Sequence, residues 1–200
     1  MSLVTNFLFI TFFYLIGSIP FALILTKLLG HGDIRDIGSG NVGATNVLRT
    51  GNKYLAFTVL FLDIFKGVLP FIILSYLYDT NILHSIFLSH FAILGHIFPI
   101  WLKFKGGKGV ATYIGFLIGL NFFIGLYFLL TWITIAWISR YSSLSSLAAT
   151  LVAPLYFFFI NPNYIVVIFL LYLFLIISVK HRENIKRLMS GSENKIKFSK

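Results

Sequence analysis

The sequence contains no cysteine and little charge of either sign. The absence of cysteine excludes disulfide bonds, thiolate metal sites and a cysteine nucleophile. Charged residues make up 11% of the chain, against about 25% of an average soluble domain. Acidic residues are the scarcest, because 6 Asp and Glu stand against 16 Lys and Arg, a net charge of +10. With 58% hydrophobic residues and a mean hydropathy of +0.91, the composition excludes a soluble fold and predicts a membrane protein.

Seven apolar stretches have the length, or nearly the length, of a membrane-spanning helix, which needs about 20 residues. They are Leu3–Leu29, Tyr54–Tyr78, Ile82–Leu102, Val110–Leu120, Phe122–Ile138, Leu144–Ile160 and Tyr164–Val179. The stretch from Val110 is short and would have to tilt or lie partly buried. We predict an all-α polytopic membrane protein with seven transmembrane helices, forming a single domain over residues 1–188 and followed by a basic tail over 189–200.

The basic residues predict the orientation of these helices. If the N-terminus lies outside, the inner loops, the tail and the helix end at Lys27 hold every one of the 16 basic residues except Lys66. The outer connections, around Asp79 and around Pro162, contain no Lys or Arg. The positive-inside rule therefore places the N-terminus outside and the C-terminus in the cytoplasm, which requires an odd number of spans. Five spans also satisfy the rule if two segments are re-entrant. The positive charge needs no nucleic acid to explain it, because it also attracts anionic lipid.

Two glycine-rich loops lie on the inner side of the predicted membrane domain. The first is Gly38–Asn46, with the sequence GSGNVGATN, and the second is Lys105–Gly109, with the sequence KGGKG. Glycines let backbone N–H groups converge on an anion, the N-terminus of the following helix is positive, and Lys108 adds a full charge. Both loops therefore predict phosphate binding. Tight turns between helices are the alternative explanation.

Segments in and near these loops partly match three familiar motifs. The glycines of Gly38–Gly43 match G-x-G-x-x-G, but no strand precedes them, which excludes a dinucleotide fold. The second loop lacks the spacing of a nucleotide-binding P-loop, and Val110 replaces the hydroxyl residue that would meet magnesium. His31 and Asp36 have the spacing of the His and Asp dyad found in soluble-facing and monotopic glycerolipid acyltransferases. That dyad stays an alternative catalytic pair.

Charged side chains inside a membrane span need a partner or a cavity. Asp63 and Lys66 are three positions apart, so we expect them to pair along one helix face rather than to act in catalysis. His90 and His96 do not share a helix face, and no two histidines have ligand spacing. We therefore predict no metal ion and no cofactor. His181 and Asn184 would point the same way, toward the inner loops, if the last helix continues beyond the bilayer.

Taken in order, the motifs of nearly the whole chain resemble the acyl-phosphate:glycerol-3-phosphate acyltransferase family, PlsY, of bacterial membranes. The matching segments are Gly17–Pro20, Gly38–Asn46 with Arg49, Leu62–Gly67, Gly95–Pro99, Phe104–Thr112, Arg140–Tyr141 with the following serines, and His181–Ile185. The two glycine motifs in this order are highly specific. The resemblance implies a seven-helix fold in the bacterial inner membrane, with the active site facing the cytoplasm, in agreement with the charge distribution.

The resemblance also implies an activity. Members of this family transfer a fatty acyl group from acyl phosphate to the 1-hydroxyl of sn-glycerol 3-phosphate, giving lysophosphatidic acid and phosphate, the first acylation of phospholipid synthesis. Acyl-CoA and acyl-carrier protein are not their donors. The acyl phosphate comes from a partner enzyme, the acyl-phosphate synthase PlsX. A membrane transporter or exchanger for organic phosphates is the alternative function, because its basic inner vestibule would look similar.

The residues of the active site are carried over from the family by position. The implied catalytic residues are Ser39, Arg49, Lys108, Ser146, His181 and Asn184. The predicted substrate-binding residues, most of them in the two glycine-rich loops, are Gly38, Gly40, Asn41, Gly43, Asn46, Gly106, Gly107, Gly109, Arg140 and Ser143. Which of Ser142, Ser143, Ser145 and Ser146 lines the site stays open, since serines are dense there. No loop acid is placed as a general base, so we expect a substrate phosphate to accept the hydroxyl proton.

Overall fold

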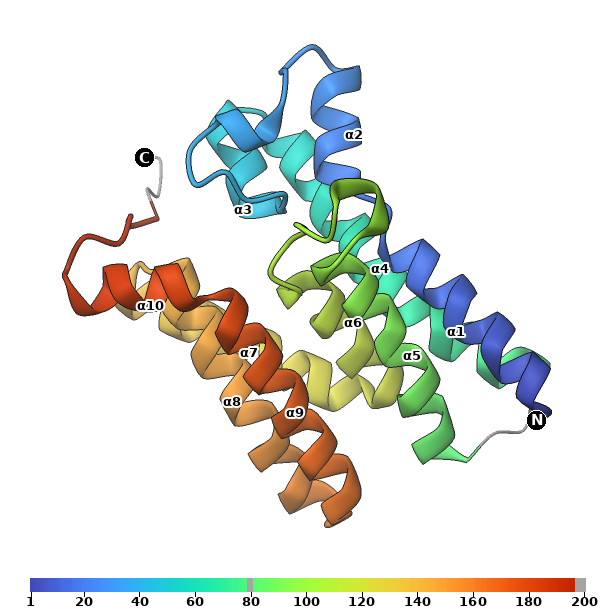
Figure 1. The fold of residues 1–200 in the computed structure, drawn as a ribbon. Helices are drawn as coiled ribbons and strands as arrows, with labels where there is room; N and C mark the ends of the chain where they lie inside the picture. Colours follow the sequence, from blue (N-terminus) through green and yellow to red (C-terminus); the bar gives the residue numbers. More distant parts are fainter. Residues whose placement is uncertain (79–80, 197–200) are drawn as a thin grey trace. The chain divides into compact units, whose positions relative to one another are not determined.

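The computed structural model describes residues 1–78 and 81–196. Within these ranges the regular structure is helical and contains no strand, which confirms the predicted all-α class. The chain divides into two compact units, Met1–Leu120 and Asn121–Lys200 (Figure 1). Asp79 of the predicted outer connection and residues 197–200 of the predicted tail lie outside the described residues.

The first unit consists of helices of very different lengths. They are α1 (Leu3–Gly17), α2 (Phe21–Leu28), α3 (Ala44–Val47), α4 (Lys53–Leu77), α5 (Ile82–Ile97) and α6 (Val110–Leu120), with 3-10 turns η1 (Ile34–Asp36), η2 (Leu48–Thr50) and η3 (Ile100–Leu102). Polar residues fix where the long helices begin. The side chains of Ser2, Asn52 and Asn81 accept hydrogen bonds from the first turns of α1, α4 and α5.

The first predicted span, Leu3–Leu29, is broken in the structure. Helices α1 and α2 meet at an angle of 41° across the three residues that separate them. Pro20 lies at this break, where its ring and its missing N–H prevent a regular helix from continuing. At the break the carbonyl oxygen of Ile19 accepts the backbone N–H of Phe21 at 3.1 Å, and a buried side chain of α4 also donates to it.

Glycines allow the helices of the first unit to pack backbone against backbone. Gly17 of α1 lies against the backbone of α5, and Gly95 of α5 lies against that of α1. Gly67 of α4 and Gly115 of α6 face each other's helices in the same way. A Cβ atom at any of these four positions would collide with backbone atoms. Small residues at helix contacts are typical of membrane proteins, in which close packing rather than hydrophobic burial drives helix association.

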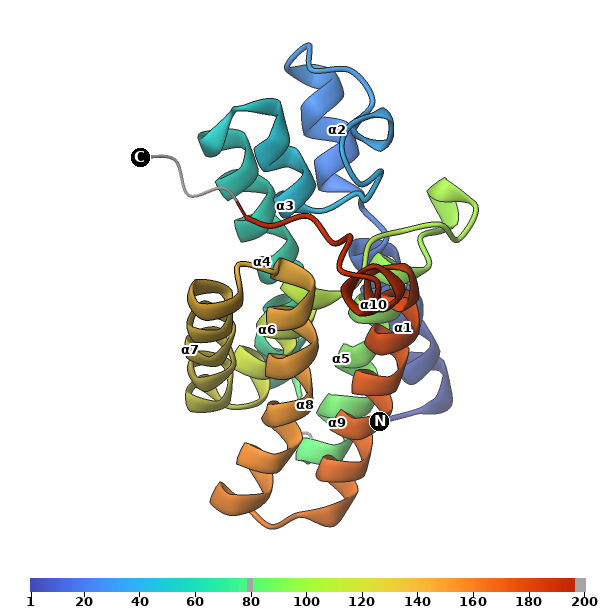
Figure 2. The same cartoon turned by 90° about the vertical axis from the view of Figure 1, so that its left-hand side faces the viewer.

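The second unit contains α7 (Phe122–Ser139), α8 (Ser142–Ile160), α9 (Tyr164–Lys180) and the short α10 (Arg182–Met189). Helix α8 packs against both α7 and α9 (Figure 2). Between α7 and α8 the rings of Tyr127 and Tyr156 stack with their centroids 3.8 Å apart. Asn121 and Asn163 cap the N-termini of α7 and α9.

The last helix does not run straight on beyond its apolar part. Helices α9 and α10 meet at 67°, with His181 at the corner. The His181 ring bonds to the carbonyl oxygen of Ile177, 2.8 Å away, which also accepts the backbone N–H of His181. Helix α10 carries Lys, Arg, Glu and Asn, and such a polar helix gains by leaving the apolar layer.

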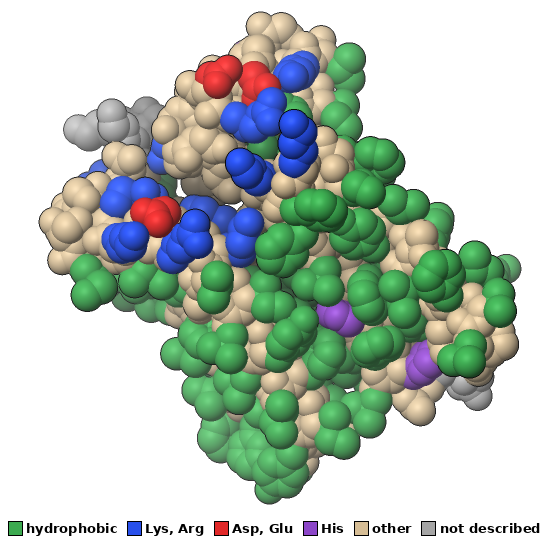
Figure 3. Space-filling view, viewed as in Figure 1, with side chains coloured by type: hydrophobic (Ala, Val, Ile, Leu, Met, Phe, Trp, Pro, Cys, Tyr) green, Lys and Arg blue, Asp and Glu red, His purple; other side chains and the backbone are tan. Residues whose placement is uncertain are grey.

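Within residues 1–78 and 81–196, four helical stretches are long and apolar enough to cross a membrane, namely Lys53–Leu77, Ile82–Leu102, Phe122–Ser139 and Ser142–Ile160. The number rises to six if the bent pairs α1 with α2 and α9 with α10 each count as one span. Helix α6, the remaining predicted span, has 11 residues. Hydrophobic side chains cover the face formed by α1 and α5, whereas Lys and Arg gather over the loops of the same unit (Figure 3). This separation of surfaces is that of an integral membrane protein.

Candidate active site

The first glycine-rich loop is organised around the buried side chain of Asn46. Its amide nitrogen donates to the carbonyl oxygens of Ile34 (2.9 Å) and Ile37 (2.8 Å). Its side-chain oxygen accepts the backbone N–H of Ser39 at 3.0 Å and faces the Ser39 hydroxyl at 3.3 Å. Asn46, which was predicted to bind substrate, therefore uses both amide protons inside the loop and fixes the position of Ser39.

Arg49 lies against the same loop. Its side chain packs over Gly38, where a Cβ atom would lie 2.5 Å from the guanidinium and 2.6 Å from the Asn46 oxygen. Gly38 and Gly40 have φ values of +58° and +69°, which L side chains rarely adopt. Both glycines are thus required by the conformation of the loop. The structure brings Arg49 and Ser39, two predicted catalytic residues, to one loop.

The His31 and Asp36 alternative finds no support in the geometry. The His31 ring faces the Asn52 amide at 3.5 Å, and no hydrogen bond or ion pair joins His31 to Asp36 in the part of the chain that the structure describes. In this segment Asp33 forms ion pairs, with Arg35 at 2.6 Å and with Lys27 at 3.3 Å. Hydrogen bonds from Arg35 hold the pKa of the Asp33 carboxyl well below its usual range.

The second glycine-rich loop closes the end of α5. The backbone N–H groups of Gly106 and Gly107 donate to the carbonyl oxygens of Ile97 (3.2 Å) and His96 (3.1 Å). These two amides therefore satisfy the last turn of α5 and do not cradle an anion, contrary to our expectation for them. A Cβ atom at Gly106 would collide with the His96 carbonyl, which explains why the loop needs glycine there.

The positive end of α6 follows directly on this loop. The Gly109 carbonyl accepts the Tyr113 N–H at 2.8 Å as the first helical hydrogen bond, and Gly109 itself has a φ of +85°. The first N–H groups of any α-helix have no intrahelical partner and carry the positive end of its dipole. Lys108 precedes this helix start by two residues. Of the groups expected to bind an anion at this loop, Lys108 and the start of α6 stay candidates, whereas the amides of Gly106 and Gly107 already have backbone acceptors.

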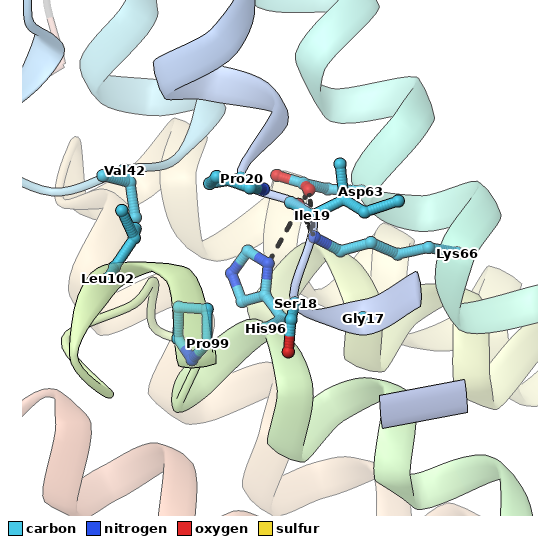
Figure 4. Close-up of a pocket in the computed structure, with 10 residues that line it drawn as sticks. All are labelled: Gly17, Ser18, Ile19, Pro20, Val42, Asp63, Lys66, His96, Pro99 and Leu102. Carbon is cyan, nitrogen blue, oxygen red and sulfur yellow. Dashed lines mark hydrogen bonds and ion pairs between the residues drawn. The ribbon is translucent and has the colours of Figure 1, made fainter. Parts of the chain in front are cut away.

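Behind the loops lies a buried cluster of charged side chains. The Lys66 ammonium lies 2.7 Å from the Asp63 carboxylate and donates to the Ile19 carbonyl at 3.0 Å (Figure 4). Nδ1 of His96 lies 3.6 Å from the same carboxylate oxygen. The predicted pairing of Asp63 and Lys66 along one helix face is confirmed. The cluster ties α4 to α5 and to the break between α1 and α2.

A small cavity of about 10 Å³ beside this cluster is lined by residues in or next to both glycine-rich loops. Its lining includes Val42 from the first loop and Leu102 from the segment before the second. Leu102 also packs against the hydrophobic cluster that contains Val42. The second loop touches the charged cluster directly, since Gly107 lies against the His96 ring. The two glycine-rich loops therefore share one end of the first unit.

The second unit holds the remaining predicted catalytic residues in its buried interior. Ser146 accepts a hydrogen bond from the Trp132 indole at 3.0 Å and donates to the Ser142 carbonyl at 2.8 Å. Ser145 donates to the carbonyl of Tyr141 at 2.7 Å instead. His181 and Asn184 are 2% and 6% exposed. The structure thus distinguishes the clustered serines by their hydrogen bonds.

Glu193 is a residue of this unit that sequence reasoning missed. Its carboxylate accepts hydrogen bonds of 2.7 Å each from Ser143, Asn184 and Arg187. Burial alone raises the pKa of Glu193, but the hydrogen bonds from Asn184, Ser143 and Arg187 outweigh it and leave the pKa below its usual value. In the sequence, Glu193 is distinguished only as the single acid of the basic tail 189–200, and this tail carries no recognisable motif.

Arg140 also contacts the tail. Its guanidinium lies 3.3 Å and 3.4 Å from the carbonyl oxygen of Ile196, and the Ile196 N–H donates to the Arg140 carbonyl at 2.7 Å. Arg140 has a φ of +62°, in the left-handed region, at the junction of α7 and α8. The segment from Glu193 to Ile196 is therefore an ordered part of the second unit.

The chain is similar to known proteins over nearly its whole length. The model of the family described as glycerol-3-phosphate acyltransferase matches residues 7–191. The glycerol-3-phosphate acyltransferase of Pelagibacter ubique is 53% identical over 185 residues, which cover 92% of this chain and 94% of that protein. The corresponding protein of Bartonella henselae is 50% identical over 195 residues, 96% of this chain and 92% of its own length.

Two solved structures share the fold. They are crystal structures of PlsY, described as an integral membrane glycerol 3-phosphate acyltransferase, in a glycerol 3-phosphate form and a lysophosphatidic acid form. Each is 36% identical and covers 96% of both chains, with TM-scores of 0.89 and 0.87. With the glycine loops, the basic residues beside them and the apolar helices in place, these matches show that the chain belongs to the glycerol-3-phosphate acyltransferase family of the PlsY type.

Proposed function

We propose that this protein transfers a fatty acyl group from acyl phosphate to the 1-hydroxyl of sn-glycerol 3-phosphate, giving lysophosphatidic acid and phosphate. The observation that carries the proposal is its likeness to PlsY, whose structures are described with glycerol 3-phosphate and with lysophosphatidic acid. Acyl phosphate as the donor is supported by the two glycine motifs, which resemble those of the acyl-phosphate-dependent family. The supply of that donor by the acyl-phosphate synthase PlsX is part of the proposal.

The chemistry requires little beyond binding and charge neutralisation. Acyl phosphate is a mixed anhydride with a good leaving group, so the protein must orient the attacking hydroxyl and stabilise negative charge. Lys108 and Arg49 supply cations, and the start of α6 supplies backbone N–H donors. Ser39, held in place by Asn46, serves as a hydrogen-bond donor. The reaction needs no metal ion and no cofactor.

The proposed mechanism has no protein base and no protein nucleophile. Of the two acids closest to the first glycine-rich loop, Asp33 is held by Arg35, and Asp36 forms no hydrogen bond or ion pair with His31 among the described residues. A phosphate oxygen of the bound substrate then accepts the proton of the attacking hydroxyl. Trapping of an acyl group on Ser39 in a single-turnover mixture would contradict this mechanism.

Seven spans with the N-terminus outside and the active site in the cytoplasm complete the proposal. The positive-inside rule supports this orientation, and α6, with 11 residues, would bring the number of spans to seven as a short segment partly buried against its neighbours. The protein would then lie in the bacterial inner membrane, where both the fatty chain and soluble glycerol 3-phosphate are within reach. The groups that contact substrate would lie in residues 1–188, with 189–200 as the tail.

Reconstituted vesicles test the proposed function against transport of organic phosphates. Purified protein in lipid vesicles is given labelled glycerol 3-phosphate, with and without acyl phosphate. We expect labelled lysophosphatidic acid only when acyl phosphate is present, and no trapped label without it. Uptake or exchange of label in the absence of acyl phosphate would overturn the proposal in favour of a transporter.

A further inference from the structure

Three hydrogen-bond donors converge on the carboxylate of one tail residue. Ser143 at the start of α8 and Asn184 on α10 both donate to one oxygen of Glu193, and Arg187 donates to the other, each at 2.7 Å. The Glu193 side chain is 8% exposed although it follows the last helix. Charge-assisted hydrogen bonds of this length are strong, and three of them fix the carboxylate closely.

The backbone turns the tail back onto α10. The N–H of Ser192 bonds to the carbonyl of Arg187 at 2.8 Å, and that of Gly191 bonds to the carbonyl of Leu188 at 3.2 Å. This is the hydrogen-bond pattern of a Schellman motif, and Gly191 adopts the left-handed conformation it requires, with a φ of +70°. The turn reverses the chain, so that Glu193 meets the face of α10 that carries Asn184 and Arg187.

The consequence for Asn184 is a restricted side chain. An Asn side chain rotates about two bonds, so a ligand that fixes this side chain on binding must offset the conformational entropy that the side chain loses. A carboxylate that already holds the Asn184 amide removes this cost before substrate arrives and selects one orientation of the amide. The same carboxylate orients the hydroxyl of Ser143.

We propose that Glu193 is a positioning residue for the reaction, which holds Asn184 and Ser143 in the orientation that binds glycerol 3-phosphate. The proposal rests on the proposed function, since it takes glycerol 3-phosphate as the ligand. For a variant without the Glu193 charge, it predicts a change in glycerol 3-phosphate affinity opposite to the change expected from charge alone. Removing a negative charge beside a phosphate site should strengthen phosphate binding by charge alone, whereas loss of positioning should weaken it.

The test compares Glu193→Gln with Glu183→Gln, its matched control. Glu183 lies on the exposed face of the same helix with Arg182 and Lys186, so both variants lose one carboxylate of α10 or its tail. For purified enzyme with acyl phosphate, we expect Glu193→Gln to raise the apparent KM for glycerol 3-phosphate about 10-fold. The apparent KM for acyl phosphate and the melting temperature should stay near those of the wild type, and Glu183→Gln should match the wild type throughout.

A double-mutant cycle separates positioning from a general structural role. If Glu193 acts through Asn184, then Glu193→Gln should change kcat/KM for glycerol 3-phosphate little in an Asn184→Ala background. Effects that multiply in the double variant would overturn the proposal. An unchanged or lowered KM in Glu193→Gln would also overturn it, and a lowered KM would mark the carboxylate as a competitor for the phosphate.

Two further variants keep the test decisive if Glu193→Gln does not fold. Ser143→Ala and Arg187→Met each leave two of the three hydrogen bonds to the carboxylate, and each should raise the KM for glycerol 3-phosphate selectively. Normal KM values in both would contradict the proposal. A wild-type enzyme that forms no lysophosphatidic acid would overturn the proposed function and this inference with it, whereas an active wild type with normal variants would overturn the inference alone.

Discussion

The ammonium of Lys66 lies 2.7 Å from the carboxylate of Asp63, less than one turn away on the same membrane helix, and each residue is 2% exposed. Neither charge can remain without a partner in such surroundings. The pair is completed by the Ile19 carbonyl and the His96 ring, so that it joins a helix break to the end of α5. The pair lines the same small cavity as Val42 of the first loop, and the His96 ring beside it lies against Gly107 of the second loop.

Breaking this pair should destabilise the protein strongly. We expect Lys66→Met to lower the free energy of unfolding by about 3–5 kcal/mol, because it leaves the Asp63 charge buried without its main partner. The double variant Asp63→Asn with Lys66→Met should lose clearly less, and Lys53→Met, at the exposed start of the same helix, should lose under about 0.5 kcal/mol. Denaturation in detergent micelles measures all three. A double variant as unstable as Lys66→Met alone, or less stable, would contradict the account.

The packing of α4 against α6 should depend on the missing side chain of Gly115. A methyl group there would collide with the Ile64 carbonyl, so Gly115→Ala should cost about 3 kcal/mol in stability. Gly51→Ala provides the comparison, since a Cβ atom there meets nothing within 4 Å and only the φ of +85° is unfavourable, for about 1 kcal/mol. Equal melting temperatures for the two variants would show that α4 and α6 do not pack as described.

Lys108 should be needed for turnover rather than for folding. In Lys108→Ala the transition state loses a cation, and we expect kcat to fall about 100-fold at saturating concentrations of both substrates. Lys105→Ala removes the same charge from an exposed position three residues earlier and should keep most of the activity. Single-substrate titrations to saturation separate kcat from KM. If Lys105→Ala and Lys108→Ala lose the same activity, the charge of the loop as a whole is what matters.

The Glu193 carboxyl should titrate below its ordinary pKa. The folded pKa is lowered, so the ionised contact adds stability that is fully present above pH 4.5 and is lost as the pH falls through the folded pKa. The sequence contains only two glutamates, Glu183 and Glu193, so carboxyl-¹³C-glutamate gives two resonances. The resonance that disappears in Glu193→Gln should have its midpoint below pH 4.5. A midpoint above that value would contradict the three hydrogen bonds.

Composition and periodicity predicted the helices well, because an apolar run in a membrane has few alternatives to helix. Each of the seven predicted stretches contains an α-helix, although Leu3–Leu29 holds two and the α-helix of Ile82–Leu102 ends at Ile97. The breaks were harder to predict, since Pro20 also fits a helix that is only kinked, and His181 bends its helix through a hydrogen bond to Ile177 that the sequence does not display.

For the site, the residue types were predictable and their hydrogen bonds were not. The pairing of Asp63 with Lys66 followed from their spacing. The amides of Gly106 and Gly107 donate to the last turn of α5. This pairing depends on the path of the loop, which a glycine-rich sequence does not determine. Glu193 was missed because its partners lie on α8 and α10, up to 50 residues away in sequence.

The most direct measurement is a comparison of acyl donors. Purified protein is given glycerol 3-phosphate with acyl phosphate, acyl-CoA or acyl-carrier protein of the same chain length, and the lipid product is identified by mass spectrometry. We predict lysophosphatidic acid acylated at the 1-hydroxyl from acyl phosphate alone. Product from either of the other donors, or no product from acyl phosphate, would contradict the proposed activity.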